Sequence, residues 1–319
     1  MTAFETYQRI KNNMAKTIAG KEAILDLVII TLFCGGHILL EDVPGTGKTM
    51  IARALSASID GDFKRIQFTP DLLPSDVTGI NYFNMKESEF QFLKGPIFSN
   101  ILLADEINRA TPKTQAGLLE CMEEHTATID GKTYVLADPF MVIATQNPLE
   151  SMGTYPLPEA QLDRFLIKTA VGYPDDASSV EILRRFGEKS GLKNAEPVVT
   201  LADVKDAMEE TAKVFCHEEL FIYITEIISL TRKMPGVVLG ASPRAGLALL
   251  MAAKGYAILN GRNYVLPDDI KKAAVPVLNH RLLLGSSEML KKNSAEKIID
   301  DVLVRVAVPT ETVFDGRQR

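Results

Sequence analysis

Short apolar runs alternate with stretches of helical periodicity over the first 170 residues of the chain. Five of these runs are expected to be strands, at residues 37–41, 64–68, 101–105, 140–145 and 165–170. Four of them are rich in isoleucine, leucine or valine, which is typical of strands covered on both faces, whereas the remaining run, at 64–68, is more mixed. This alternation predicts an α/β fold built on a parallel sheet.

The pattern changes after the linker-like sequence Tyr-Pro-Asp-Asp at 173–176. From there to the end of the chain, helical periodicity dominates. Ser242 followed by Pro243 is typical of a helix start, since it joins a capping side chain to a first-turn proline. The sequence therefore predicts an α/β domain over residues 1–174 and a helical domain over residues 175–319.

Two segments inside the first domain have the pattern of β-hairpins. Asp130 and Gly131 form a two-residue turn signal flanked by alternating residues. Residues 79–95 place two strand-like runs on either side of a polar tip at 86–89. We expect both hairpins to be insertions that the core sheet does not require, and the polar tip to be exposed to solvent.

Composition narrows the class of protein. The 319 residues fit two domains, and the net charge of −6 disfavours a nucleic-acid motor, which would need a basic surface. The three cysteines lie far apart and form no C-x-x-C pair, which indicates a reduced cytoplasmic compartment. The first residues contain no apolar h-region, so we expect no secretory signal, and no run reaches the roughly 20 apolar residues that cross a bilayer. We therefore expect a cytoplasmic protein without a membrane span.

The most informative segment is HILLEDVPGTGKTMIARAL, which leads from a strand through a glycine-rich loop into a helix. Gly45 and Gly47 let backbone N–H groups approach a phosphate at the positive end of that helix. Lys48 supplies a charge for the β- and γ-phosphates, and the Thr49 hydroxyl suits Mg²⁺. Asp42 stands where the usual pattern has a first glycine, and its side chain is expected to point away. The expected nucleotide-binding residues of this loop are Pro44, Gly45, Thr46, Gly47, Lys48, Thr49 and Met50.

A second segment completes the same chemistry. The apolar run Ile101–Asp105 ends in an acid and is followed at once by Glu106. Asp105 is expected to hold Mg²⁺ through water, and Glu106 to orient and deprotonate the water that attacks the γ-phosphate. No two of the four histidines have zinc-ligand spacing, and no serine or cysteine lies in a nucleophile motif. Together with the glycine-rich loop, these acids predict ATP hydrolysis.

Four segments in this order and spacing resemble the MoxR family of AAA+ ATPases: EDVPGTGKT, LLADEINRATPKTQAGLLECMEE, IATQNPLESMGTYPLPEAQLDRF and GASPRA. The resemblance covers nearly the whole chain, and several family members also carry aspartate in place of the first loop glycine. It implies a five-stranded core with helices on both faces, a small helical lid, and an ATP-dependent homo-oligomeric ring, a hexamer. It also implies a chaperone-like role in the maturation or remodelling of a client protein, with a partner that carries a von Willebrand factor A domain.

The resemblance assigns roles to further residues. Asn147 matches the sensor 1 position, whose amide reaches the γ-phosphate or the attacking water. Arg164 matches the arginine finger that one subunit offers to the next, and Arg244 matches sensor 2, a second reader of the γ-phosphate. Ile18 and Gly20 match the segment that contacts adenine. In the AAA+ strand order, Gln67 would face the strand that carries Glu106. One hypothesis is that Gln67 restrains that glutamate until a partner binds. Arg109 is interpreted as an interface or salt-bridge residue.

Three alternative functions stay open at this point. The chain resembles the motor subunit of metal chelatases such as magnesium chelatase, which carry the same hairpin insertions and act with a dedicated metal-inserting partner. A nucleic-acid motor is disfavoured by the acidic composition and by the lack of a recognisable DNA-binding module. A nucleotide-gated assembly switch without turnover is disfavoured by Glu106, because a pure switch has no need of a base. The sequence does not identify the client.

Overall fold

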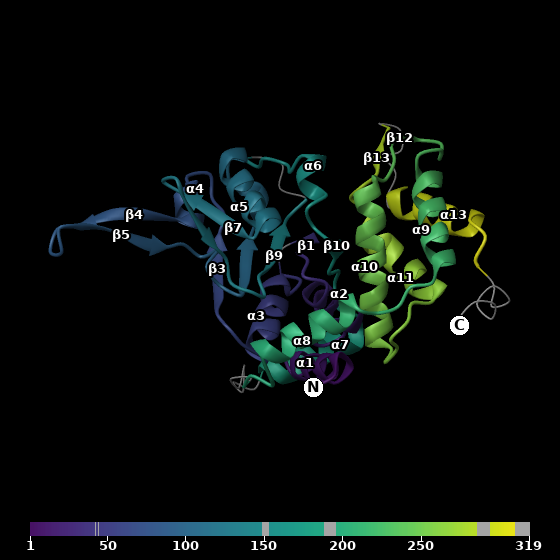
Figure 1. Cartoon of the computed structure of the whole chain (residues 1–319). Coiled ribbons are helices and arrows are strands. Elements are labelled where there is room, and N and C mark those ends of the chain that lie inside the picture. The colour runs from purple at the N-terminus through teal and green to yellow at the C-terminus, as the bar shows by residue number, and fades with distance from the viewer. Residues whose placement is uncertain (42, 44, 149–152, 188–195, 286–293, 310–319) are drawn as a thin grey trace.

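A five-stranded parallel sheet lies at the centre of the first half of the chain, with the strand order β10-β1-β9-β6-β3 (Figure 1). The computed structural model describes residues 1–41, 43, 45–148, 153–187, 196–285 and 294–309. The five strands expected from the hydrophobic pattern are confirmed. They are β1 (Ile38–Glu41), β3 (Phe63–Gln67), β6 (Ile101–Asp105), β9 (Met141–Gln146) and β10 (Ile167–Ala170).

Alternate residues of the central strands enter two separate cores on the two faces of the sheet. The helices are α1 (Ala3–Ala15), α2 (Glu22–Phe33) and α3 (Lys48–Ser58) on one face and α5 (Pro112–Glu124) on the other. Ile38 and Leu40 belong to the first core, whereas Leu39, between them in β1, belongs to the second. Successive strand side chains point to opposite faces, so burial on both sides requires an apolar residue at almost every position.

Both expected hairpins are present. β4 (Gly79–Asn84) pairs with β5 (Glu89–Lys94), and β7 (Thr126–Ile129) pairs with β8 (Lys132–Val135). Asp130 and Gly131 have φ angles of 50° and 80°, so both central residues of the turn are left-handed, as a type I′ turn requires. The β4–β5 hairpin extends well away from the body of the molecule, after the short helix α4 (Pro74–Thr78) (Figure 1).

The second half of the chain is mainly helical. Its helices are α7 (Asp176–Gly187), α8 (Leu201–Ala212), α9 (Glu218–Thr231), α10 (Pro243–Leu259), α11 (Pro267–Leu278) and α13 (Ser294–Arg305). The predicted start of α10 is confirmed, because the Ser242 hydroxyl accepts the backbone N–H of Ala245 at 3.3 Å and Pro243 opens the first turn. Two short strands, β12 (Val237–Leu239) and β13 (Leu283–Leu284), pair with each other, and β12 comes just before this cap in the chain.

Helix α8 connects the two halves of the chain. It packs against α1 and α2 and also contacts α10. The backbone N–H of Ala3 donates to the Glu210 carboxylate at 2.7 Å, and β11 (Val199–Thr200), just before α8, pairs with β2 (Ile59–Asp60), just after α3. The division of the chain at residue 174 therefore stays a prediction, since helical residues beyond it pack on the α/β core.

Within the described parts of the chain, no helix is both long and apolar enough to cross a membrane. Those same parts contain no group of three or more histidine, cysteine or acidic residues placed to share a metal ion. The three cysteines are free thiols, and burial raises the pKa of each of them, that of Cys34 to about 12.

His37, the residue before β1, joins β9 to α5. Its Nδ1 accepts the backbone N–H of Val142 at 2.9 Å, so its Nε2 carries the proton and donates to the Met122 carbonyl at 3.1 Å. Burial lowers the pKa of His37 to about 4, although its bond to the Met122 carbonyl acts in the opposite direction. A neutral imidazole is therefore part of the folded state.

We predict that protonation of His37 destabilises the protein in mild acid. The folded pKa lies below the unfolded value of about 6.5, so the unfolded state binds the extra proton and stability falls as pH drops from about 6.5 toward 4. Between pH 7 and pH 5 this group removes about 2 kcal/mol, because one pKa unit corresponds to about 1.4 kcal/mol. Urea unfolding at both pH values checks this. His37→Gln, which keeps a donor and an acceptor, should lose this part of the pH dependence, and an unchanged dependence would contradict the assignment.

Candidate functional site

The loop between β1 and α3 forms an open cradle at the carboxyl edge of the sheet. Gly45 and Gly47 have φ angles of 85° and 94°, and a Cβ atom added to either would meet nothing within 4 Å. Lys48, the first residue of α3, donates from Nζ to the Val43 carbonyl at 3.0 Å, which holds its side chain over the loop. Backbone N–H groups at this helix start fit a chain of phosphates. Asp42 and Pro44 lie outside the described residues.

Thr49 and Asp105 come together beneath this loop. The Thr49 hydroxyl lies 3.4 Å from Asp105 Oδ2, and the Thr145 hydroxyl of β9 donates to Asp105 Oδ1 at 2.6 Å. Asp105 is buried, with a side chain only 10% exposed. A hydroxyl and a carboxylate are the oxygen ligands that Mg²⁺ prefers, so this pair fits the metal expected from the sequence.

Glu106 is held beside this pair by its own backbone and by two side chains. Its φ and ψ are 56° and 51°, and its backbone N–H donates to the Thr145 hydroxyl at 2.9 Å. The Gln67 amide donates to Glu106 Oε2 at 2.8 Å, and Arg109 forms a salt bridge to the same oxygen at 3.0 Å. The expected proximity of Gln67 and Glu106 is thus observed, and Arg109 forms the salt bridge that was one reading of its position.

These groups line one cavity of about 390 Å³ at the edge of the sheet. Asn147, which follows β9 and is buried, lies in its wall with Lys48, Thr49 and Glu106. The described lining residues are Gly45, Thr46, Gly47, Lys48, Thr49, Met50, Arg65, Gln67, Asp105, Glu106, Gln146 and Asn147. The cavity therefore combines a glycine-rich loop at a helix start, a hydroxyl–carboxylate pair that suits a divalent cation and the further carboxylate of Glu106.

A second cavity of about 220 Å³ begins where the first ends and shares Gly45, Thr46, Gly47 and Met50 with it. Ile18 lines it, as expected for a residue beside adenine, together with Ile182 of α7. Gly20 is not part of the described lining. Its φ is 67°, and a Cβ atom there would collide with the Ser178 hydroxyl, so this glycine allows α7 to approach closely.

Arg164 and Arg244 lie together on one carboxylate. Arg164 Nε binds one oxygen of the Glu123 carboxylate at 2.9 Å, and Arg244 Nη1 binds the other at 3.1 Å. Neither arginine is among the described residues that line the two cavities. The structure therefore brings the two arginines to one carboxylate at the end of α5, and the role expected for Arg244 as a reader of the γ-phosphate stays a prediction.

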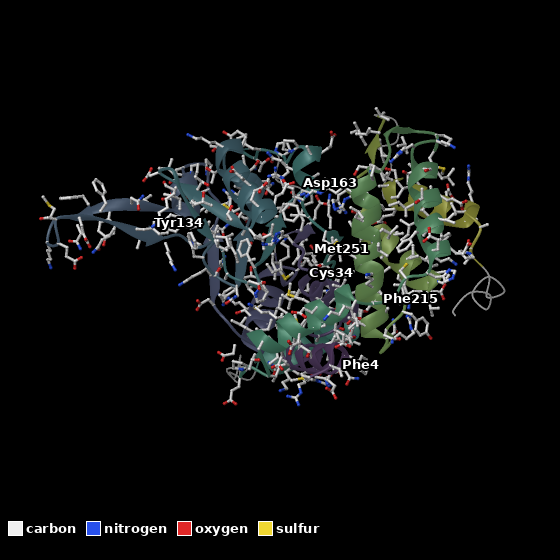
Figure 2. The ribbon with its side chains drawn as sticks, viewed as in Figure 1. Phe4, Cys34, Tyr134, Asp163, Phe215 and Met251 are labelled. Atoms are coloured by element: carbon white, nitrogen blue, oxygen red, sulfur yellow. The ribbon has the colours of Figure 1, made fainter. Side chains whose placement is uncertain are left out.

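Arg281 fixes the segment that carries Arg164 to the helical half of the chain. Its buried guanidinium donates to the Asp163 carboxylate at 2.6 Å and to the Phe165 carbonyl at 2.7 Å. Asp163 lies at the junction between the core and the lid helices, where Figure 2 shows it facing α10. A buried cation needs such partners, so this network holds the Arg164 segment against the residues that follow α11.

Three residues of the site did not stand out in the sequence. Arg65 donates to Asp105 and Gln67, Thr145 orients Asp105 and the Glu106 backbone, and Glu123 collects the two arginines. Arg65 could have been found from its spacing, because it stands two positions before Gln67 and so shares its face of the strand. Glu123 offered no such signal, since its role depends on how the lid docks.

Two family models match the chain. The model described as ATPase family associated with various cellular activities (AAA) matches residues 37–167, and the AAA lid domain matches residues 229–302. A solved structure of a protein from Cytophaga hutchinsonii superposes with a TM-score of 0.90 at 40% sequence identity. The superposition covers 97% of this chain and 96% of that one. These matches agree with the five-stranded core and the helical lid.

Curated relatives cover most of the chain. YeaC of Bacillus subtilis is 49% identical over 93% of this chain and 92% of its own length. Chaperone MoxR1 of Mycobacterium tuberculosis is 40% identical over 95% of this chain and 82% of its own length. Protein MoxR of Methylorubrum extorquens is 28% identical over 94% of each chain. With its phosphate cradle, its paired acids and its helical lid, the chain belongs to the MoxR family of AAA ATPases.

Proposed function

We propose that this protein hydrolyses ATP with Mg²⁺ in a ring of identical subunits and uses the energy to mature or remodel a client protein. The observation that carries the proposal is the convergence of Lys48, Thr49, Asp105, Glu106 and Asn147 on one cavity beside the glycine loop. The name of its relative Chaperone MoxR1 supports the chaperone-like role.

The residues divide the chemistry among them. The backbone of Gly45 to Lys48 and the Lys48 ammonium bind the phosphates, and Thr49 with Asp105 would hold Mg²⁺, which supplies charge stabilisation at the phosphates. Glu106 orients the attacking water toward the γ-phosphate and accepts a proton from that water. The Asn147 amide orients the same water or the phosphate. The apolar second cavity at Ile18 and Met50 takes the adenine ring.

We predict that Glu106→Gln keeps ATP affinity but slows hydrolysis by about 10²–10⁴, the usual contribution of a positioned base. The amide retains the size of the side chain and loses only its basicity. Lys48→Ala should instead weaken nucleotide binding itself, because it removes the charge over the loop. Fluorescent-nucleotide titration separates the two effects, and steady-state phosphate release measures turnover. Wild-type turnover in Glu106→Gln would contradict the role of Glu106.

The placement of Arg164 and Arg244 supports a site shared between subunits. Both lie on Glu123 and outside their own cavities, as suits residues that serve a neighbouring copy. Along α10, Arg244 shares one helical face with Leu247 and Met251, which are 64% and 40% exposed. We therefore extend the trans role expected for Arg164 to Arg244.

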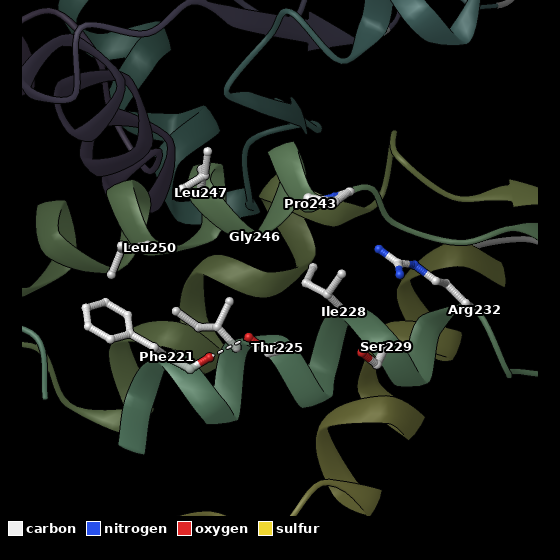
Figure 3. Close-up of a pocket in the computed structure, with 10 residues that line it drawn as sticks. Phe221, Thr225, Ile228, Ser229, Arg232, Pro243, Gly246, Leu247 and Leu250 are labelled. Carbon is white, nitrogen blue, oxygen red and sulfur yellow. Dashed lines mark hydrogen bonds between the residues drawn. The ribbon is translucent and has the colours of Figure 1, made fainter. Parts of the chain in front are cut away.

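An apolar groove beside this face suits contact with a second copy. It has a volume of about 320 Å³ and lies between α9 and α10, and its lining includes Phe221, Leu247 and Leu250 (Figure 3). Exposed apolar patches on a folded chain often mark protein contacts. A neighbour that covers this groove would also meet Arg244, the second residue of α10.

We predict that two inactive variants restore activity when mixed. Arg164→Ala should bind ATP and hydrolyse it poorly, since removing a finger that acts on the transferring phosphoryl group typically costs about 10³–10⁵ in turnover. Its own pocket keeps Glu106, whereas Glu106→Gln still offers Arg164 to a neighbour. Mixed assemblies contain some sites with both groups, so phosphate release should partly return and should rise with protein concentration. If the variants assemble together and no activity returns, Arg164 does not act in trans.

The β4–β5 hairpin offers a surface for a client or for a partner with a von Willebrand factor A domain. Phe83 and Phe90 form an edge-to-face pair with ring centroids 5.3 Å apart, and they are 50% and 75% exposed. Met85, 87% exposed, lies beside them next to the polar tip. The hairpin is not part of the five-stranded sheet, and its exposed aromatic surface is available for binding.

We predict that replacing the tip at residues 86–89 with glycine and serine, together with Phe90→Ser, leaves basal ATPase activity nearly unchanged and reduces partner binding. Partners are captured from the native host on the ATP-locked Glu106→Gln protein, with and without the hairpin change. Val135→Ser, which removes a 78%-exposed apolar side chain from the other hairpin, is the matched control and should retain capture. A collapse of basal activity would assign the β4–β5 hairpin a structural role instead.

A further inference from the structure

Arg65 lies between the expected metal ligand and the expected base. Its guanidinium donates to Asp105 Oδ2 from Nη2 at 2.7 Å and from Nε at 3.2 Å. The same Nη2 donates to the Gln67 side-chain oxygen at 3.1 Å, and the Gln67 amide donates to Glu106 at 2.8 Å. The four side chains therefore form one unbroken chain of hydrogen bonds, in the order Asp105, Arg65, Gln67 and Glu106.

The strand register explains why these residues meet. β3 pairs with β6 so that Gln67 lies opposite Asp105, and Arg65 lies two positions earlier on the same face of β3. The Arg65 side chain is 41% exposed and borders the cavity, so it has room to leave the carboxylate. Asp105, 10% exposed, has no such freedom, because Thr145 fixes its other oxygen.

A divalent cation held by Thr49 and Asp105 would compete with Arg65 for the same carboxylate. The Thr49 hydroxyl approaches Asp105 Oδ2, which is the oxygen that Arg65 binds. Two positive groups at one poorly hydrated oxygen repel each other, so binding of one disfavours the other. Once Arg65 leaves, the Gln67 oxygen loses its donor, and the amide that holds Glu106 loses its orientation.

We propose that Arg65 is a positioning residue that makes release of Glu106 depend on metal binding at Asp105. With Arg65 on Asp105, Gln67 is oriented and holds Glu106 aside. Displacement of Arg65 by the cation frees Gln67, which leaves Arg109 as the remaining donor to Glu106 Oε2, so the base is less restrained at a site that holds its metal. The inference rests on the proposed ATP hydrolysis and adds a control step to it.

Binding of Mn²⁺ at saturating ADP, measured from the paramagnetic resonance signal of free Mn²⁺, tests the competition without any turnover. Because coupling between two sites is reciprocal, Arg65→Met should tighten Mn²⁺ binding by about tenfold. Lys64→Met is the matched control. Lys64 directly precedes Arg65 in β3, so its side chain points to the opposite face of the strand. The change removes the same charge and should leave Mn²⁺ affinity unchanged. Arg65→Lys keeps a cation beside Asp105 and should stay near the wild-type affinity.

A double-variant cycle tests the connection through Gln67. Gln67→Leu removes one partner of Arg65 and should tighten Mn²⁺ binding a few-fold. Adding it to Arg65→Met should bring no further gain, since both changes break one network. Gln67→Leu leaves the ion pair in place, so it gives an answer even where Arg65→Met folds poorly. Equal affinities for Arg65→Met and Lys64→Met, or additive effects in the cycle, would overturn the inference while leaving the ATPase proposal intact. A wild-type protein that binds no nucleotide would overturn both.

Discussion

The buried carboxylate of Asp105 must be compensated by its surroundings, because an unpaired charge at this depth would cost several kcal/mol. Three groups from three elements provide the compensation: the Thr145 hydroxyl from β9, the Arg65 guanidinium from β3 and the Thr49 hydroxyl from α3. These contacts require β3, β9 and β6, which carries Asp105, to end at the same edge of the sheet. They also require the glycine loop to lie next to that edge. The same carboxylate thus helps to fix the geometry of the site, and its negative charge suits the cation that we propose there.

The fold was predictable wherever burial alone determines the sequence. β6 and β9 lie in the middle of the sheet with helices on both faces, so almost every residue in them is apolar and the strands are visible as uninterrupted runs. β3 is an edge strand, and its pattern of exposed Lys64 and Arg65 around buried Ile66 made it the most mixed of the five. The hairpin at Asp130 was visible because its turn admits few residue types.

The site was predictable where one local segment contains the chemistry, as in the loop from Gly45 to Thr49. It was not predictable where the chemistry depends on elements that meet only after folding. Arg65 reaches Asp105 through the register of two strands, and Glu123 meets Arg244 across 121 residues of sequence, through docking of the lid. The spacing of Arg65 and Gln67 indicates a shared face of β3, but only the pairing of β3 with β6 brings that face to Asp105. The contact between Arg244 and Glu123 has no such local signal.

The junction between core and lid contains ion pairs that differ in their exposure to solvent. Among the described residues, the arginines at 164, 244 and 281 bind the carboxylates of Glu123 and Asp163 there. The Arg281 side chain is only 4% exposed, whereas those of Arg164 and Arg244 are 27% and 50% exposed. Salt screens ion pairs that are open to solvent much more than buried ones. Concentrated salt should therefore loosen the two outer arginines from Glu123 while Arg281 still holds the core to the lid.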